Sequence, residues 1–305
     1  NGTNVSTNAT LLWTPSRSDS FWFKYAQAPR TSTRAERDVS ILGGASVVLT
    51  PAPVPVITYV HGNSKLGAEK SQGVELGYLK QFSTTLSADI NVYRYRYTDL
   101  RSGRQTGMFA CDSALAVVDV AKCGYFGIPI GTPVLFNETQ TINGLAAWNN
   151  GIEFSADWLV APGWRLQLSY SWSHLKVEGG SDPATSADAD ITQRGSPRHQ
   201  ASLRSQWNIT TSQQLDLWLR GASGMDRVNL VDTVPSATGP PTFTHIPGYA
   251  TLDLRYAYHA NKYLEFALIG RNLIGRHRLE YISDFIPTAA TEIAPMWLIS
   301  THWRF

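Results

Sequence analysis

The sequence predicts an all-β protein, an antiparallel transmembrane β-barrel, and three observations support this fold class. Apolar and polar side chains alternate along many segments, short and long connections alternate between those segments, and the composition is unusual. Charged residues make up 16% of the chain, compared with roughly 25% in soluble domains. The 10 Trp and 13 Tyr residues suit a protein whose rings lie at a lipid–water interface.

Other classes of membrane or nucleic-acid-binding protein find no support in the chain. No stretch approaches the roughly 18 consecutive apolar residues of a transmembrane helix. The first residues, "NGTNVSTNATLLW", lack the basic and apolar regions of a signal peptide, so either a leader was removed or the sequence starts within a longer protein. A net charge of +2 without a basic run gives no indication of nucleic-acid binding.

Eleven segments show the two-residue period of a β-strand, as in "WRLQLSYSWSHLK", "TLDLRYAY" and the terminal "PMWLISTHWRF". Their lengths of about 9 to 13 residues match a tilted membrane strand of about 9–11 residues better than a globular strand of about 5–6. The predicted strands are 8–15, 20–28, 72–82, 85–97, 148–160, 164–176, 198–208, 214–223, 248–258, 263–272 and 296–305.

Strand 85–97 is the least regular of these. Its apolar residues keep one parity up to Val92 and take the other from Tyr93 onwards. An extra, unpaired residue would produce such a change, so the pattern points to a β-bulge in this strand.

The connections between the strands alternate strictly in length. "SRSDS", "STT", "APG", "ITTSQ" and "HANK" are short turns, whereas the other connections are long. The long connections are 29–71, 98–147, 177–197, 224–247 and 273–295. Outer-membrane barrels have short periplasmic turns and long extracellular loops, and a soluble sandwich has no physical reason to keep one end trimmed. We therefore expect an outer-membrane protein whose C-terminus is periplasmic.

Aromatic residues gather beside the short turns, as expected for a girdle at one membrane interface. They are Trp13, Trp22, Phe82, Trp158, Trp164, Trp207, Tyr258, Tyr263 and Trp303. Any single one of them is more easily explained as core, but their shared place at the same end of successive strands favours the girdle.

The strand count predicts a partial barrel. If the short turns are periplasmic, strand 296–305 ends in the periplasm, and counting back makes strand 8–15 start outside the cell. Complete bacterial barrels have an even number of strands and no open edge in lipid. We therefore expect residues 1–305 to form one domain, the C-terminal part of a longer barrel whose upstream strands are missing.

The two cysteines, Cys111 and Cys123, lie twelve positions apart in a connection with several Gly. In an oxidising compartment they would form a disulfide, and the alternative is a pair of unlinked thiols. A metal site has little support, because the sequence nearby contains neither His nor further Cys.

Three stretches together resemble the TonB-dependent receptor family of Gram-negative outer membranes: "AQAPRTSTRAERD", "GNSKLGAEKSQGVELGYLKQF" and "LIGRNLIGRHRLEY" followed by the terminal "HWRF". The chain departs from the family at Ala68, where Pro is usual, and at Met296, near a common Arg; a Pro of the first stretch is also replaced. The residues that match are Arg30, Thr31, Arg34, Ala35, Glu36, Arg37 and Asp38; Leu66, Glu69, Ser71, Glu75, Leu76, Gly77 and Tyr78; and Asn272, Leu273 and Glu280.

This resemblance implies a barrel of about 22 strands, an N-terminal plug that carries the TonB box, and a signal peptide. The plug is absent from this sequence, and the eleven strands would be the C-terminal half of the barrel. The implied function is a TonB-dependent transporter for ferric siderophores or another scarce, bulky ligand, which needs no catalysis and no cofactor. The implied partners are the ligand, TonB through the plug, outer-membrane lipid, and the barrel-assembly machinery, which would recognise the strand ending at Phe305.

Anionic ferric chelates favour contacts with Arg and aromatic side chains. For every such residue in the long connections, loop packing or a solvated charge is the plainer interpretation. The ligand-binding candidates are Arg30, Arg34, Arg37, Tyr59, His61, Tyr125, Phe126, Phe243 and His245.

Three other functions compete with the transporter. A barrel-type outer-membrane hydrolase would need a base beside its nucleophile, but His259 and His302 lie at the turn end. A porin would not need connections near 50 residues. A glycosylated secreted protein is suggested by sequons, although such triplets arise by chance in a chain rich in Ser and Thr. The sequons start at Asn1, Asn4, Asn8, Asn137 and Asn208.

Overall fold

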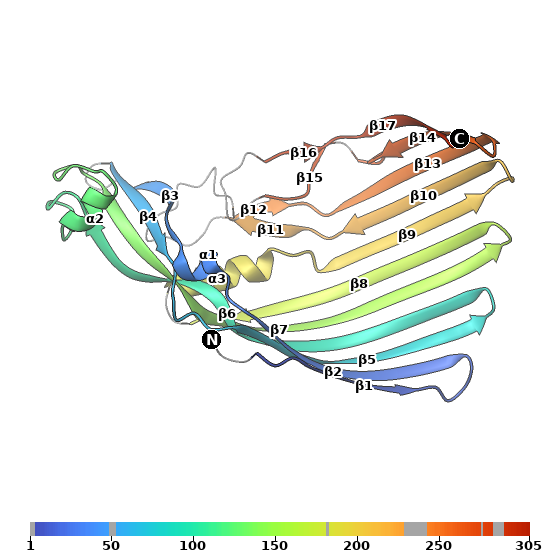
Figure 1. Cartoon of the computed structure of the whole chain (residues 1–305), viewed down its shortest axis with the longest axis horizontal. Coiled ribbons are helices and arrows are strands. Elements are labelled where there is room, and N and C mark those ends of the chain that lie inside the picture. Colours follow the sequence, from blue (N-terminus) through green and yellow to red (C-terminus); the bar gives the residue numbers. More distant parts are fainter. Residues whose placement is uncertain (1–3, 49–52, 181–182, 229–242, 276, 283–289) are drawn as a thin grey trace.

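A computed structural model of the chain describes residues 4–48, 53–180, 183–228, 243–275, 277–282 and 290–305. Eleven of the thirteen strands of the main sheet follow one another, each antiparallel to the next (Figure 1). In spatial order they are β1 (Thr7–Trp13), β2 (Asp19–Arg30), β5 (Glu69–Ser83), β6 (Leu86–Ala110), β7 (Leu135–Ala161), β8 (Trp164–Glu178), β9 (His199–Asn208), β10 (Gln213–Ala222), β13 (Tyr249–Asn261), β14 (Leu264–Arg271) and β17 (Met296–Trp303).

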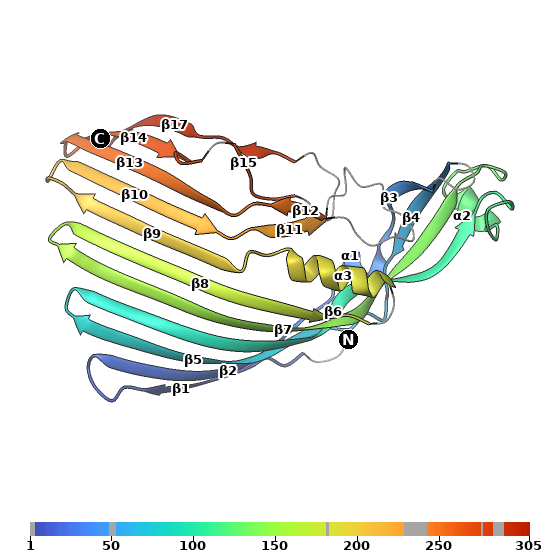
Figure 2. The same cartoon turned by 180° about the vertical axis from the view of Figure 1, so that it is seen from behind.

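These are the eleven predicted strands, and the all-β, barrel-type fold class is confirmed. The described strands do not close into a barrel, since β1 and β17 each pair with one neighbour only. The short turns lie at one end of the sheet and the long connections at the other, with the C-terminus at the turn end (Figures 1 and 2).

The long connections contain further elements. A hairpin of β3 and β4 joins the sheet because β4 runs parallel to β7. None of the helices in the described ranges is long and apolar enough to cross a membrane. The elements are α1 (Arg34–Asp38), β3 (Ser40–Val48), β4 (Val54–His61), α2 (Val120–Tyr125), α3 (Pro183–Arg194), β11 (Met225–Val228), β12 (Phe243–Ile246), β15 (Arg278–Leu279) and β16 (Glu292–Ile293).

One face of the main sheet is apolar and exposed. Residues directly opposite each other in paired strands share a face, so the register defines rows across the sheet. One row consists of Leu11, Phe23, Leu76, Val92 and Ile152, and these side chains are 37–69% exposed. An exposed apolar surface of this extent is rare in soluble proteins and is the surface that contact with lipid requires.

The opposite face is polar and joins its strands by ion pairs. These pairs are Lys24–Glu75, Arg204–Asp216, Arg220–Asp253 and Arg255–Glu265. The polar face therefore has the composition of a barrel lumen.

Aromatic rings on the polar face lie over glycines of the adjacent strand. Trp22 is registered against Gly77, and Tyr95 against Gly73. A Cβ atom built on either glycine would overlap the ring opposite it. The missing side chains thus leave room for large rings to lie flat along the wall.

Several expectations are wrong in detail. Strand β6 extends to Ala110 and strand β7 begins at Leu135, so much of connection 98–147 is a hairpin rather than a loop. No bulge interrupts 86–97, where the register with β7 is continuous; the parity change arises because this strand bears apolar residues on the lipid-type face and tyrosines on the polar one. The first irregularity in this pairing follows Tyr97.

Trp22 is also an exception to the predicted girdle, because it lies on the polar face over Gly77. Seven of the other members are exposed: Trp13, Phe82, Trp158, Trp207, Tyr258, Tyr263 and Trp303. Among the sequons, Asn8 lies within β1 and Asn208 ends β9, while Asn1 lies outside the described residues.

Replacing Gly77 by Ala should destabilise the barrel by about 1–3 kcal/mol, because the new methyl group displaces the Trp22 ring. The full-length protein in detergent micelles would be unfolded with guanidinium chloride and followed by tryptophan fluorescence. Gly124→Ala is the matched control, since a Cβ there meets no atom within 4 Å. Equal midpoints for the two variants would contradict the close packing of Trp22 on Gly77.

Candidate functional site

All nine predicted ligand-binding residues lie at the long-connection end. They occupy three places there: Arg30 and helix α1, the aromatic tip formed by β4 and the extended β6–β7 hairpin, and strand β12 (Figure 1).

The tip has a small hydrophobic core of its own. Beyond the main sheet, β6 and β7 continue as a two-stranded ribbon up to the Ala110↔Leu135 pair, and β4 adds to it in parallel. Phe109 and Phe136 stack at 4.5 Å between ring centroids, and both are at most 4% exposed. This packing lets an exposed hairpin tip hold a defined shape away from the barrel wall.

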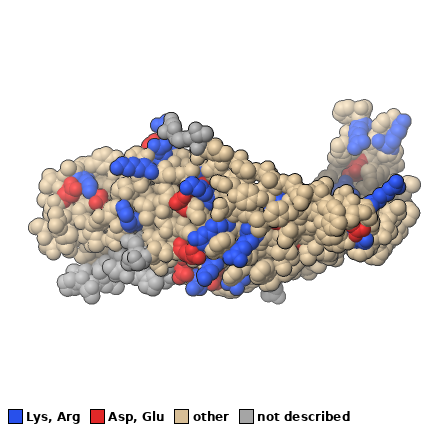
Figure 3. All heavy atoms as spheres, turned by 90° about the horizontal axis from the view of Figure 1, so that it is seen from below, with Lys and Arg blue, Asp and Glu red and all other residues tan. Residues whose placement is uncertain are grey.

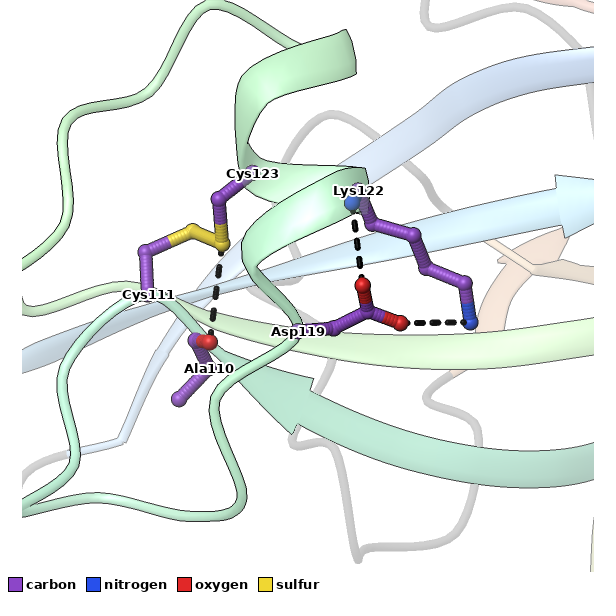
Figure 4. Close-up of a disulfide and its surroundings, with 5 residues drawn as sticks. All are labelled: Ala110, Cys111, Asp119, Lys122 and Cys123. Atoms are coloured by element: carbon purple, nitrogen blue, oxygen red, sulfur yellow. Dashed lines mark hydrogen bonds and ion pairs between the residues drawn. A yellow bond between two sulfur atoms is a disulfide. The ribbon is translucent and has the colours of Figure 1, made fainter.

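A disulfide between Cys111 and Cys123 closes the tip (Figure 4). Both cysteines are fully buried, with Cα atoms 5.8 Å apart. Cys123 belongs to α2, whose N-cap Asp119 accepts a hydrogen bond from the Lys122 backbone N–H at 3.0 Å. The disulfide therefore ties α2 to the end of β6.

Charge contacts fasten the same helix to β7. The Lys122 ammonium lies 2.6 Å from a Glu138 carboxylate oxygen and 3.4 Å from Asp119. Burial opposes the charge on Lys122, but the Glu138 and Asp119 carboxylates outweigh it and raise the pKa of Lys122. The backbone N–H of Lys122 in turn lowers the pKa of Asp119.

The structure brings four of the nine predicted residues together on this tip. The Phe126 ring contacts Tyr59 at 5.1 Å and Tyr125 at 5.0 Å, and Tyr59 lies 5.8 Å from His61. Phe126 also stacks on Phe136, so it is anchored in the core. Tyr125 is 71% exposed and is therefore the member most available to a ligand.

Arg30 belongs to an ion-pair network around Glu36, which is only 8% exposed. The Arg30 guanidinium donates to Glu36 at 2.9 Å and also pairs with Glu69. Arg101 of β6 also pairs with Glu36, and the Arg101 backbone N–H donates to Glu69 at 2.8 Å. The network joins α1 to the end of β2, the start of β5 and the middle of β6.

The charge of Glu36 is stabilised by this network. Burial by itself would raise its pKa, but the Thr33 backbone N–H, Arg30 and Arg101 together lower the pKa of Glu36 to about 2. Thr33 and Glu36 form a capping box, in which each side chain accepts from the other residue's backbone N–H. The Thr-x-x-Glu spacing is readable in the sequence, although we did not predict a capping box at this position.

The other two arginines of this segment differ in exposure and partners. Arg34 is 97% exposed in its side chain and lies 3.5 Å from Asp38. Arg37 donates to the Ser64 carbonyl oxygen at 2.7 Å. Arg34 is thus the freest of the three predicted cations.

Phe243 and His245 lie in a separate group with α3 and β11. His245 Nδ1 is 2.8 Å from an Asp226 carboxylate oxygen, and the Arg194 guanidinium lies 5.1 Å from the Phe243 ring centroid. Within the described part of the chain, no three His, Cys, Asp or Glu side chains gather as a metal site.

The strands are long and antiparallel, one face of the sheet is apolar and the other polar, and the elaborate connections lie at one end. These features are those of a receptor-type outer-membrane β-barrel. The family model "TonB dependent receptor-like, beta-barrel" matches residues 1–273, and the chain belongs to this family. The barrels of TonB-dependent receptors are outer-membrane structures, and their family is one of transport receptors.

Solved structures with the same fold include three siderophore receptors. A mutant ferric enterobactin receptor (PfeA) of Pseudomonas aeruginosa superposes with a TM-score of 0.68 at 14% identity, over 97% of this chain and 39% of that one. The siderophore receptor PirA of Acinetobacter baumannii gives 0.66 at 13%, over 98% and 41%. The ferric-catecholate import receptor Fiu of E. coli gives 0.63 at 16%, over 98% and 34%.

At these identities the similarity shows the shared barrel fold. The chain spans about two fifths or less of the length of these receptors. A search of curated proteins found no match.

Removing the disulfide with the pair of substitutions Cys111→Ser and Cys123→Ser should loosen the tip. A loop of this length loses about 3 kcal/mol of stabilisation without its bridge. In limited proteolysis of the full-length protein, we expect cleavage within residues 112–131 to become at least tenfold faster while the strands stay protected. Unchanged cleavage would mean that the Phe109–Phe136 core holds the tip without the bridge.

Replacing Glu36 by Gln should weaken the attachment of α1 to the strands by about 2 kcal/mol of free energy, because two guanidinium groups lose their shared carboxylate. Hydrogen exchange of residues 33–39 should accelerate roughly 30-fold, and Asp38→Asn, at a more exposed carboxylate, is the control. Since the pKa is lowered from 4.5 to about 2 by folding, the native contribution is complete above pH 4.5 and is lost as pH falls towards 2. Equal exchange at pH 5 and pH 2.5, corrected for intrinsic rates, would contradict this linkage.

Proposed function

We propose that the protein containing this chain is a TonB-dependent outer-membrane receptor that captures ferric siderophores at the long-connection end. The observation that carries the proposal is the family match over residues 1–273, together with the aromatic and arginine side chains at one end of the sheet. Ferric enterobactin, siderophore and ferric-catecholate receptors share the fold, which supports a catecholate-type ferric chelate as the substrate class.

In this proposal the long connections face outwards and Phe305 lies at the periplasmic side. Tyr125 and Arg34 make the first contacts with an anionic chelate, because they combine high exposure with an aromatic ring and a weakly paired cation. Arg30 has a structural role, since Glu36 and Glu69 both accept hydrogen bonds from its guanidinium group.

Transport would follow the family's logic of binding and gating, and it requires no catalytic step. Energy from TonB would act on a plug domain inside the barrel, and the polar face with its cross-strand ion pairs would be the wall around that plug. The terminal strand would serve the barrel-assembly machinery as its recognition segment, and the apolar face would contact outer-membrane lipid.

The test is binding of ferric catecholate siderophores to the full-length protein in a host without its own catecholate receptors. We expect saturable binding, and at least tenfold weaker binding for the double variant Tyr125→Ala, Arg34→Ala. Arg17→Ala is the control, because Arg17 is an exposed cation in a turn at the opposite end. A folded, membrane-inserted protein that neither binds nor takes up any ferric siderophore would contradict the proposal, and an equal effect of the control would contradict the site.

A further inference from the structure

Basic side chains border the apolar face at its long-connection end. The row that contains Val92, Ile152 and Trp172 is apolar. Two residues farther along each strand, about 7 Å away, the same face bears Arg94 and His174.

A second basic row follows directly. There Arg96 of β6, Trp148 of β7 and Lys176 of β8 are opposite one another. Adjacent strands lie about 4.8 Å apart, so the Cα atoms of Arg96 and Lys176 are separated by about 10 Å across Trp148. We call Arg94, Arg96, Trp148 and Lys176 the basic rim.

Trp148 holds the two guanidinium groups in place. The Arg94 and Arg96 Cζ atoms lie 4.3 and 4.9 Å from the centroid of its ring. Stacking on an aromatic face orients a guanidinium while leaving its edge donors open to a further acceptor. Tryptophan itself is the side chain preferred at a membrane interface.

The basic rim has more positive charge than its acidic neighbour neutralises. Glu178 pairs with Arg96 at 2.9 Å. Within the described ranges, Arg94 has no carboxylate partner, and the ammonium group of the exposed Lys176 makes neither a hydrogen bond nor an ion pair. Figure 3 shows basic and acidic side chains gathered midway along the molecule.

We infer that the basic rim binds the phosphorylated headgroup of a lipid in the outer leaflet. A lipid is favoured over a soluble anion because the rim continues the exposed apolar rows on the same face, where acyl chains would lie. Charge-assisted hydrogen bonds from Arg94, Arg96 and Lys176 would hold the phosphate groups above those chains. The choice of leaflet rests on the proposed outward orientation of the long connections.

The test uses the full-length protein in detergent micelles and native mass spectrometry with bisphosphorylated lipid A as the probe. The variant is Arg94→Gln, Arg96→Gln, Lys176→Gln. Lys80→Gln is the matched control, because Lys80 lies on the same face at the short-turn end and pairs with Asp19.

We expect the triple variant to bind the probe about 100-fold more weakly, at roughly fivefold for each charge removed, and the control to bind as the parent does. Dephosphorylated lipid A should not be retained. Equal retention of the dephosphorylated lipid, unchanged binding by the triple variant, or displacement of the probe by millimolar inorganic phosphate would overturn the inference.

Two further measurements separate this inference from the proposed function. Siderophore binding in the same preparations tests the transporter, and its failure leaves the lipid measurement standing. Labelling of an Arg34→Cys variant in intact cells by an impermeant maleimide tests the orientation, because Arg34 is exposed at the same end of the sheet and outside the rim. Labelling is expected, and protection from the reagent would place the rim away from the outer leaflet and overturn the inference.

Discussion

Backbone pairing in hydrocarbon is the constraint on which this structure depends. Lipid offers no hydrogen bonds, so every N–H and C=O group of a spanning segment must find its partner in the neighbouring strand. The antiparallel ladder joins each strand from β1 to β17 to the next, and its register shifts at only a few positions. Once the ladder fixes the register, side chains alternate between the two sides of the sheet, and the sheet acquires one lipid-type and one lumen-type face.

The same ladder explains how distant segments form a tip. Because β6 and β7 keep pairing beyond the main sheet, their ribbon offers an edge on which β4 adds in parallel. Cys111 and Cys123 can then be buried with Phe109 and Phe136 in a core that no isolated loop would have. The position of Phe126 and Tyr59 is therefore a consequence of strand pairing that begins in the membrane-type part of the sheet.

The sequence was sufficient to predict the strands that have lipid on one face and the barrel lumen on the other. A strand between lipid and lumen must alternate, so period two indicated the main strands, with 85–97 as the least regular of them. Hairpin β3–β4 could not, because "SILGGASVV" has no clear alternation and its partner in β7 lies more than 70 residues away. Trp22 was misplaced because its ring depends on the absence of a side chain at Gly77, which a reading of single strands does not consider.

For the candidate site, residue type alone could not distinguish cations that stabilise the fold from cations that are free to bind a ligand. Arg30 and Arg34 are four positions apart and look alike in the sequence, yet two acceptors, Glu36 and Glu69, occupy the first. The second has only a partly exposed Asp38 at 3.5 Å. The acceptors that decide this difference come from α1 and β5, and they converge only after the strands have paired. Tertiary structure therefore decides whether an arginine is free to bind a ligand. At this end of the barrel, Arg30 stabilises the fold, whereas Arg34 is exposed to solvent.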